Sequence, residues 1–201
     1  AVEQLPYWIT ARLAAATERV VSGDSSARAS RAAAVLIPIV LHAAGPTVLL
    51  TERARHLSKH AGQVSFPGGA VEAADVDLAA TALRETEEEV GIAASKIQVL
   101  ACLGEYHTIS GFCVTPVVGV LTPPFSMRPD PREVADVFEL PLAVLLDRSR
   151  YEKRWVQRAG VRAPTHFLEL NGRVVWGATA GILLNFSLDL ALQGIPKDLT
   201  V

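Results

Sequence analysis

Residues 62–92, a glycine-containing loop followed by an acidic segment, constrain the fold of this chain more than any other stretch. Asp77 is a favourable N-cap residue, and the residues from Leu78 to Val90 include many strong helix formers. Gly91 follows them as a natural helix-ending residue, because glycine accepts the left-handed conformation. The pattern therefore predicts a helix over 78–90.

The predicted helix has two chemically different faces. One face carries residues suited to packing: Ala79, Leu83, Thr86 and Val90. Glu85, Glu88 and Glu89 share i, i+3 and i+4 spacing and are expected on nearly the opposite face. Like charges at this spacing repel one another, and the helix dipole disfavours anions in the last turns. Either a solvated acidic face or a cation site would account for the cluster.

The loop in front of the helix favours the cation site. Gly68 and Gly69 give the backbone of the Phe66-Pro67-Gly68-Gly69 segment freedom to approach a ligand closely. Clustered carboxylates beside such a loop suit a hard, oxygen-seeking divalent cation, so we expect Mg²⁺ or Mn²⁺.

At these residues the sequence resembles the Nudix hydrolases, whose signature reads G-x5-E-x7-R-E-U-x-E-E-x-G-U, with U a bulky apolar residue. The matching positions are Gly69, Arg84, Glu85, Glu88, Glu89, Gly91 and Ile92. The segment between Gly69 and Arg84 is one residue longer than in the general pattern. Asp75 stands where a glutamate is expected, and Thr86 replaces the apolar residue.

A second motif is similar to the one that marks the coenzyme A (CoA) pyrophosphatase branch, L-L-T-x-R-(S/A)-x3-R-x3-G-x3-F-P-G-G. Leu49-Leu50-Thr51-Glu52-Arg53-Ala54 is followed, in register, by Gly62 and the Phe-Pro-Gly-Gly segment. Ser58 occupies the place of the second arginine, and neighbouring Lys59 is the candidate to supply its charge.

The resemblance implies which residues bind metal and which assist the reaction. It implies Glu85 and Glu89 as ligands of Mg²⁺ or Mn²⁺, followed by Glu88, with the carbonyl oxygen of Gly69 as a further donor. Glu88 and Glu133 are the two candidates for general base, because family members differ in the carboxylate that serves. Glu133 lies at the start of an expected strand, where a surface role is an equal alternative. Arg84 is expected to orient the glutamates.

Substrate binding is expected from the segment before the loop, which has potentially basic residues at Arg53, Arg55, His56, Lys59 and His60. The planar guanidinium of arginine suits phosphate oxygens, so Arg53 is the leading phosphate contact. Lys59, His60 and the backbone at Gly68 and Gly69 are the further substrate-binding candidates. A solvated basic loop is the alternative. Trp8, Trp155 and Trp176 are expected in the core, rather than stacked on a base.

The resemblance implies a metal-dependent hydrolase that cleaves the pyrophosphate of CoA or its derivatives. The products would be 3′,5′-ADP and 4′-phosphopantetheine, or its acylated equivalent. Ser58 keeps ADP-ribose or NADH open as the substrate. A nucleotide-binding regulator without turnover is a third alternative, against which the intact Glu85, Glu88 and Glu89 argue.

Composition sets the broader limits. A chain of 201 residues, half of them hydrophobic and a fifth charged, is expected to form one globular domain over 1–201. Residues 1–30 are the expected N-terminal helix and loop of that domain. A net charge of -2 gives no reason to expect nucleic-acid binding. Cys102 and Cys113 are expected to be free, buried thiols, and no metal–thiolate spacing is visible in the sequence.

No membrane partner is expected. Residues 32–51 carry no charge, but Pro38 and Gly45-Pro46 interrupt them, so two strands are favoured over a membrane span. Glu3, Gln4 and Pro6 interrupt any signal-like apolar run at the start. We expect a cytoplasmic enzyme with a small-molecule substrate, and the sequence leaves open whether it forms a homodimer.

The pattern predicts strands interrupted by helices, which indicates an α/β fold with mixed sheets. Helices are expected at Leu5–Val21, Leu78–Val90, Pro141–Leu146 and Gly177–Leu192. Strands are expected at Ala33–Leu41, Thr47–Thr51, Lys96–Tyr106, Phe112–Leu121, Glu133–Glu139, Tyr151–Val156, Thr165–Leu170 and Arg173–Trp176. The Nudix resemblance implies an α/β/α sandwich with the carboxylate-bearing helix against one sheet.

Overall fold

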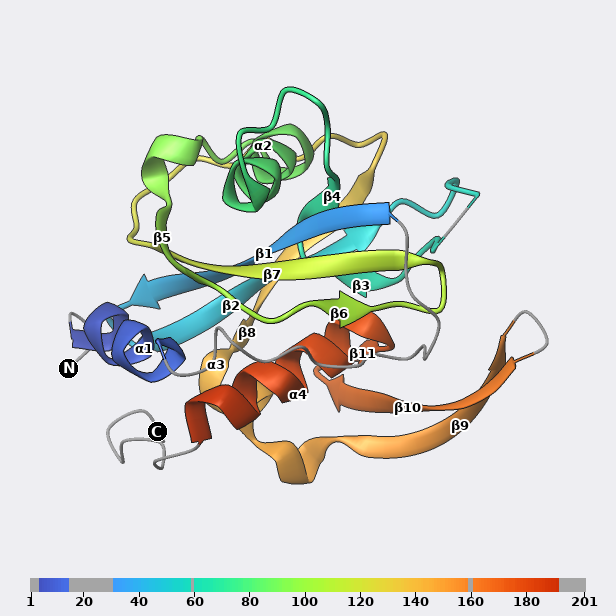
Figure 1. Ribbon diagram of the computed structural model, residues 1–201. Coiled ribbons are helices and arrows are strands. Elements are labelled where there is room, and N and C mark those ends of the chain that lie inside the picture. Colours follow the sequence, from blue (N-terminus) through green and yellow to red (C-terminus); the bar gives the residue numbers. More distant parts are fainter. Residues whose placement is uncertain (1–3, 15–30, 59, 159–160, 192–201) are drawn as a thin grey trace.

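The computed structural model describes residues 4–14, 31–58, 60–158 and 161–191 (Figure 1). The helices are α1 (Leu5–Leu13), α2 (Leu78–Val90), α3 (Leu142–Leu146) and α4 (Ala178–Ala191), with short 3₁₀ turns η2 (Ala94–Lys96) and η3 (Arg148–Arg150). The strands are β1 (Arg31–His42), β2 (Gly45–Arg53), β3 (Val64–Ser65), β4 (Gly68–Ala70), β5 (Gln98–Cys102), β6 (Tyr106–His107), β7 (Phe112–Leu121), β8 (Val134–Pro141), β9 (Glu152–Arg158), β10 (Val161–Leu170) and β11 (Arg173–Trp176).

The main sheet is mixed, as the sequence predicts. Its strands follow the order β3-β2-β1-β7-β5, while β4 also pairs with β1, β6 with β7 and β8 with β2. β1 and β7 run parallel over ten residue pairs, from Arg31 opposite Phe112 to Val40 opposite Leu121. The other described pairs in this sheet are antiparallel.

Helices cover both faces of this sheet, with α2 on one side and α1, α3 and α4 on the other (Figure 1). Alternate residues of β1 enter the two cores, because successive side chains of a strand point to opposite faces. Leu36 and Val40 belong to the core under α2, whereas Ile37 and Ile39 belong to the core that contains Phe186 of α4. The expected α/β/α class is confirmed.

A second, antiparallel sheet of order β11-β10-β9 packs beside α4 (Figure 1). Arg173 of β11 forms ion pairs with Glu52 and Asp136 of the main sheet and holds the two sheets together. β11 contacts β3, so the second sheet approaches the glycine-containing loop. This arrangement creates the wall of a cavity, described below.

Several predicted boundaries hold, and others need correction. α2, β7 and β11 have the predicted limits. The strand predicted over 96–106 is instead two strands, β5 and β6, separated at residues 103–105. The loop before α2 contains two short strands: β3 pairs with β2, and the glycine backbone of β4 pairs with β1. The first predicted helix ends at Leu13 in the described part, and its residues 15–21 lie outside the described residues.

No described helix is both long and apolar enough to cross a membrane. Both cysteines are free, as predicted. Cys102 is exposed, however, so the expected burial is wrong for this residue; it lies at the end of β5, where the strand meets the break before β6.

Candidate active site

α2 begins and ends as its sequence dictates. The Asp77 carboxylate accepts a hydrogen bond from the Ala80 N–H at 2.7 Å, and Gly91 closes the helix with a φ of 72°. The main-chain oxygens of Glu89 and Val90, at the end of the helix, accept hydrogen bonds at 3.0 and 2.8 Å from N–H groups of the loop 127–133, which precedes β8. The helix terminus and this loop are therefore held together.

Glu89 lies at the buried edge of α2, against the glycine-containing loop. Its side chain is 4% exposed; Oε2 accepts a hydrogen bond from the Gly68 N–H at 3.1 Å, and Oε1 lies 3.5 Å from Arg53 Nη1. Burial raises the pKa of Glu89 to about 7, and the Gly68 N–H and Arg53 only partly oppose this rise. Glu89 is therefore not part of a solvated acidic face, because β4 packs along this side of α2.

Glu85 is also largely covered, with its side chain 15% exposed, and burial raises its pKa. A Cβ atom at Gly69 would collide with the Glu85 carboxylate, so only glycine leaves room for this side chain beside β4. Glu88, by contrast, is 58% exposed. The three glutamates thus form a gradient from the buried Glu89 to the exposed Glu88.

Glu133 joins this group from the other side of the site. It is exposed immediately before β8, and its N–H donates to the Asp130 carbonyl oxygen at 3.0 Å. Burial is the main cause of the raised pKa values of Glu85 and Glu89, and the negative charge of Glu133 is a smaller one. Glu133 therefore lies near both residues. Among the described residues, the carboxylates of Glu85, Glu88, Glu89 and Glu133 do not place three oxygens within 4.8 Å of one another.

Arg84 uses all five of its N–H groups to restrain this site. Nε and Nη2 donate to the two oxygens of Asp75 at 2.9 and 3.1 Å, and Nη2 also donates to the Ala70 carbonyl oxygen at 3.1 Å. Nη1 donates to Glu85 Oε1 at 3.0 Å and to Glu88 Oε2 at 3.1 Å. Arg84 therefore turns Glu85 and Glu88 toward itself and ties α2 to β4.

Two departures from the family signature have physical explanations in this geometry. Asp75 accepts the paired hydrogen bonds of Arg84, which hold the pKa of Asp75 well below its ordinary value, and it also accepts from Thr81 Oγ1 at 2.8 Å. Thr86 is fully buried, and its hydroxyl donates to the Ala82 carbonyl oxygen at 2.7 Å. Its polar group is thereby satisfied within the helix.

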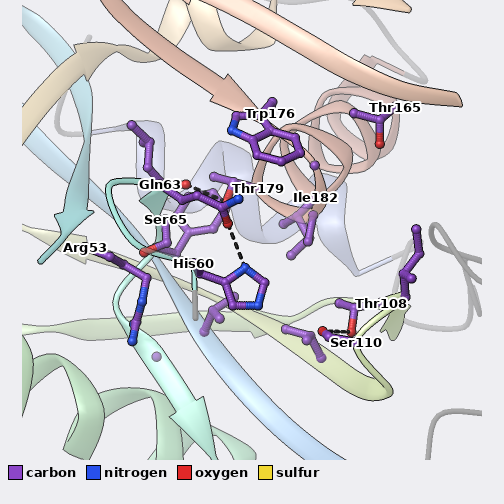
Figure 2. A pocket seen from close by; sticks show the side chains of 18 of the residues that line it. Arg53, His60, Gln63, Ser65, Thr108, Ser110, Thr165, Trp176, Thr179 and Ile182 are labelled. Atoms are coloured by element: carbon purple, nitrogen blue, oxygen red, sulfur yellow. Dashed lines mark hydrogen bonds between the residues drawn. The ribbon is translucent and has the colours of Figure 1, made fainter. Parts of the chain in front are cut away.

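Arg53, the predicted phosphate contact, stands between Glu89 and a cavity of about 510 Å³. Its Nε atom is buried and has no hydrogen-bond partner. Most buried polar groups are paired, so an orphaned guanidinium N–H marks a place for an acceptor oxygen. The cavity joins residues that are far apart in sequence, as Figure 2 shows for Arg53 and His60, Thr108 and Ser110, and Trp176.

Of the other residues predicted to bind substrate, some line the cavity and one lies outside the described residues. His60 lines the cavity, with a φ of 56° and its Nδ1 2.7 Å from Gln63 Oε1. Gly68 lines it too, whereas Lys59 lies outside the described residues. The core position expected for Trp155 is wrong, because this residue is 62% exposed on the edge strand β9.

Some cavity residues carry no recognisable sequence signal. Thr108 and Ser110 belong to the β6–β7 connection, and Thr179 and Ile182 belong to α4. Trp176, for which core packing was the expectation, also lines the cavity while stacking on Phe167 at a centroid distance of 5.6 Å. Only the three-dimensional fold brings these segments to the loop that follows Arg53.

Comparison with known proteins places this site in a family. Residues 30–159 match the NUDIX domain. Over 163 residues, covering 81% of this chain and 84% of the relative, the sequence is 45% identical to the "Uncharacterized Nudix hydrolase NudL" of Salmonella paratyphi B (strain ATCC BAA-1250 / SPB7). The relative of the same name from Salmonella newport (strain SL254) gives the same values.

Solved structures are also similar to the chain. The crystal structure of a C. elegans Ap4A hydrolase binary complex has a TM-score of 0.48 and 22% identity, and covers 55% of this chain and 80% of that chain. The NUDIX domain of Shewanella oneidensis NrtR, complexed with ADP ribose, has a TM-score of 0.45 and 23% identity, and covers 60% of this chain and 79% of that chain.

The domain match and the NudL relatives define the class: a hydrolase that acts on pyrophosphate-containing, small-molecule nucleotide substrates. The chain belongs to the Nudix hydrolase family. Enzymes of this family generally use divalent cations such as Mg²⁺ or Mn²⁺.

Proposed function

We propose that this chain hydrolyses the pyrophosphate bond of CoA or its derivatives and releases 3′,5′-ADP and 4′-phosphopantetheine, or its acylated equivalent. One observation carries the proposal. Arg53, whose Nε is buried and unpaired, approaches Glu89 through Nη1 and lines a cavity of about 510 Å³. A phosphate group bound there would place its neighbouring pyrophosphate bond toward α2 and its organic arm in the cavity.

Glu85 and Glu89 would hold the divalent cation, with Glu88 and the carbonyl oxygen of Gly69 as further donors. All of these ligands are oxygen atoms, which suits Mg²⁺ or Mn²⁺. The raised pKa values of Glu85 and Glu89 support the assignment, because they mark buried carboxylates with too little positive charge nearby. When bound, the cation would neutralise phosphate oxygens and lower the pKa of the attacking water.

The chain's own groups would position the substrate and handle the proton. Arg53 would bind a phosphate oxygen through its free N–H, and the backbone N–H groups of the glycine loop would lie beside it. Glu88 or Glu133 would accept the proton of the attacking water, since both are exposed and their carboxylates are near Glu85. Arg84 would keep the carboxylates of Glu85 and Glu88 oriented through its two Nη1–H groups.

The cavity lining supports CoA as the substrate. Ile109, Trp176 and Ile182 provide apolar surface, and the hydroxyl groups of Thr108 and Ser110 provide donors and acceptors. A pantetheine arm combines hydrocarbon segments with amides and would match both kinds of surface. The cavity volume falls within the range of about 300–1,000 Å³ that is typical of small-molecule sites.

The test is a competition experiment. CoA, ADP-ribose and NADH are offered together at equal concentration with Mg²⁺ or Mn²⁺, and the products are identified by mass spectrometry. We expect 3′,5′-ADP and 4′-phosphopantetheine to form fastest. Preferential cleavage of ADP-ribose or NADH would overturn the CoA proposal and favour the alternative substrates, which the lining residue Ser58 leaves open. Tight ligand binding without any phosphate-containing product would instead support a non-catalytic regulator.

A further inference from the structure

Three chemically different side chains converge on the β6–β7 hairpin, outside the proposed active site. His107 Nε2 lies 3.5 Å from Glu105 Oε2 and 3.9 Å from Cys113 Sγ. One ligand atom from each of the three residues lies within 4.8 Å of the others, and they are the only such group of three among the described residues. His107 and Cys113 are partly buried, while Glu105 is exposed.

The distances between these three ligand atoms are close to those around a tetrahedrally coordinated cation. Zinc bonds of about 2.3 Å to sulfur and about 2.0–2.1 Å to nitrogen or oxygen place tetrahedral ligands about 3.3–3.6 Å apart. Small side-chain rotations would bring the Glu105, His107 and Cys113 atoms to such spacings from their present positions.

The hairpin backbone fixes the two central ligands in advance. His107 is paired directly opposite Cys113 in the antiparallel ladder between β6 and β7. The turn is closed by the Thr108 N–H, which donates to the Phe112 carbonyl oxygen at 2.9 Å, and by the Gly111 N–H, which donates to the Thr108 carbonyl oxygen at 3.0 Å. The cost of ordering a flexible loop around an ion is therefore largely avoided.

We propose that Glu105, His107 and Cys113 form a second metal site, for a thiophilic divalent cation of the Zn²⁺ class, with water in the fourth position. Sulfur and imidazole ligands favour Zn²⁺ over Mg²⁺ or Mn²⁺, which the all-oxygen cluster on α2 suits. Binding releases the thiol proton of Cys113 to solvent and forms a sulfur–metal bond, with no change of oxidation state. In the turn of the same hairpin, Thr108 and Ser110 line the substrate cavity.

Titration with Co²⁺, a spectroscopic substitute for Zn²⁺, tests the site in the intact, reduced protein. Bonding of a thiolate to Co²⁺ gives a charge-transfer absorption in the near ultraviolet that carboxylate ligands do not give. We expect this absorption to saturate at one equivalent per chain and to disappear when Zn²⁺ is added. Its absence from the wild-type protein would overturn the proposal.

Matched variants assign the signal to this hairpin. The absorption should be lost in Cys113→Ser and retained in Cys102→Ser, in which the other thiol is removed. It should also be retained in the Glu85→Gln/Glu89→Gln double variant, which separates it from the proposed catalytic cation. His107→Gln should weaken Co²⁺ binding at least about tenfold, since even outer-shell changes have effects of this size.

Circular dichroism of each variant checks that the fold is intact, and His107→Gln serves if Cys113→Ser does not fold. An absorption that persists in folded Cys113→Ser, or Co²⁺ affinity unchanged in His107→Gln, would show that the ion binds elsewhere and would overturn the proposal.

Discussion

Arg84 and Asp75 are joined by two hydrogen bonds, from Nε to Oδ1 at 2.9 Å and from Nη2 to Oδ2 at 3.1 Å. This paired contact fixes the plane of the guanidinium, so its other N–H groups reach Glu85, Glu88 and the Ala70 carbonyl oxygen. One side chain therefore controls the orientation of two proposed metal-site carboxylates, and its own partner is an aspartate at the position where the family signature has a glutamate.

Arg84→Lys should reduce kcat by about 10- to 100-fold and lower the melting temperature. An ammonium group has three donors and no planar fork, so it cannot satisfy Asp75 and orient the glutamates at the same time. Steady-state kinetics on CoA and thermal unfolding measure the two effects. Arg150→Lys, a change at an exposed arginine on η3, is the control. Equal kcat values for wild type and Arg84→Lys would contradict the positioning role.

Gly69→Ala should reduce kcat by about 100-fold while the protein remains folded. The added methyl group would collide with the Glu85 carboxylate and displace it, and displacement of a catalytic group by about 1 Å has effects of this size. Kinetics with saturating Mg²⁺, together with circular dichroism, measure the result. Gly172→Ala, at the β10–β11 turn, is the control: its methyl group meets open space but its φ of 75° strains the substitution, so it should lower stability and leave kcat unchanged. A fully active Gly69→Ala enzyme would show that Glu85 need not approach β4.

Local sequence signals predict α2 well, because Asp77 and Gly91 fix its ends through contacts with residues only a few positions away. The burial of Glu89 could not be predicted in this way. Helical periodicity orients side chains relative to one helix axis, whereas the cover over Glu89 comes from β4, whose pairing with β1 depends on the whole sheet. The periodicity argument therefore assigned the charge cluster correctly to one helix but left open whether its members are buried or exposed.

The residues that line the cavity were even less predictable from local sequence signals. Arg53 was predictable because it belongs to a contiguous motif, but Thr108 and Trp176 reach the cavity from segments more than fifty residues further along the chain. The cluster on the β6–β7 hairpin is similar, since His107 and Cys113 become neighbours only through strand pairing. Neither arrangement has a spacing that a linear pattern could reveal.

Arg53→Lys should raise KM for CoA by about 10- to 100-fold and change kcat less. Arg53 Nε has no partner in the protein, and the loss of a hydrogen bond to a charged phosphate oxygen has an effect of this size. Initial rates over a range of CoA concentrations separate KM from kcat. Arg55→Lys is a matched control, because Arg55 is 86% exposed and pairs only loosely with Glu52, at 3.7 Å. If both variants raise KM equally, general charge attraction explains the effect better than a phosphate contact.

Glu85→Gln and Glu89→Gln should each reduce turnover by at least about 100-fold, because a direct metal ligand contributes more than an outer-shell residue. Each amide keeps the size of the side chain but lacks the negative charge that the cation requires. Phosphate-containing products are quantified by mass spectrometry. Glu87→Gln, at an exposed position on the same helix, should keep wild-type activity. Full activity in both ligand variants would refute the metal assignment.

Stability of the metal-free protein should depend on the protonation of Glu89. Burial raises the pKa of this carboxyl group from 4.5 to about 7, so the folded chain binds the proton more tightly than the unfolded chain does. The stabilisation is fully present below pH 4.5 and is lost as the pH rises through 7. A pKa shift of this size changes the free energy of unfolding by on the order of 3 kcal/mol between the two ends of this pH range.

Urea unfolding between pH 4.5 and 8, with a chelator present, measures this dependence. Because many groups titrate in this range, the informative quantity is the difference between wild type and Glu89→Gln. Glutamine has no proton to lose, so the variant should gain stability relative to wild type as the pH rises, whereas Glu87→Gln should follow wild type throughout. Adding Mg²⁺ should reverse the trend in wild type and Glu87→Gln but not in Glu89→Gln, because the cation takes the place of the proton on Glu89 and binds best above pH 7. Parallel pH curves for wild type and Glu89→Gln would show that Arg53 and the Gly68 N–H already compensate the charge of this buried carboxylate, and would remove the argument that it needs a cation.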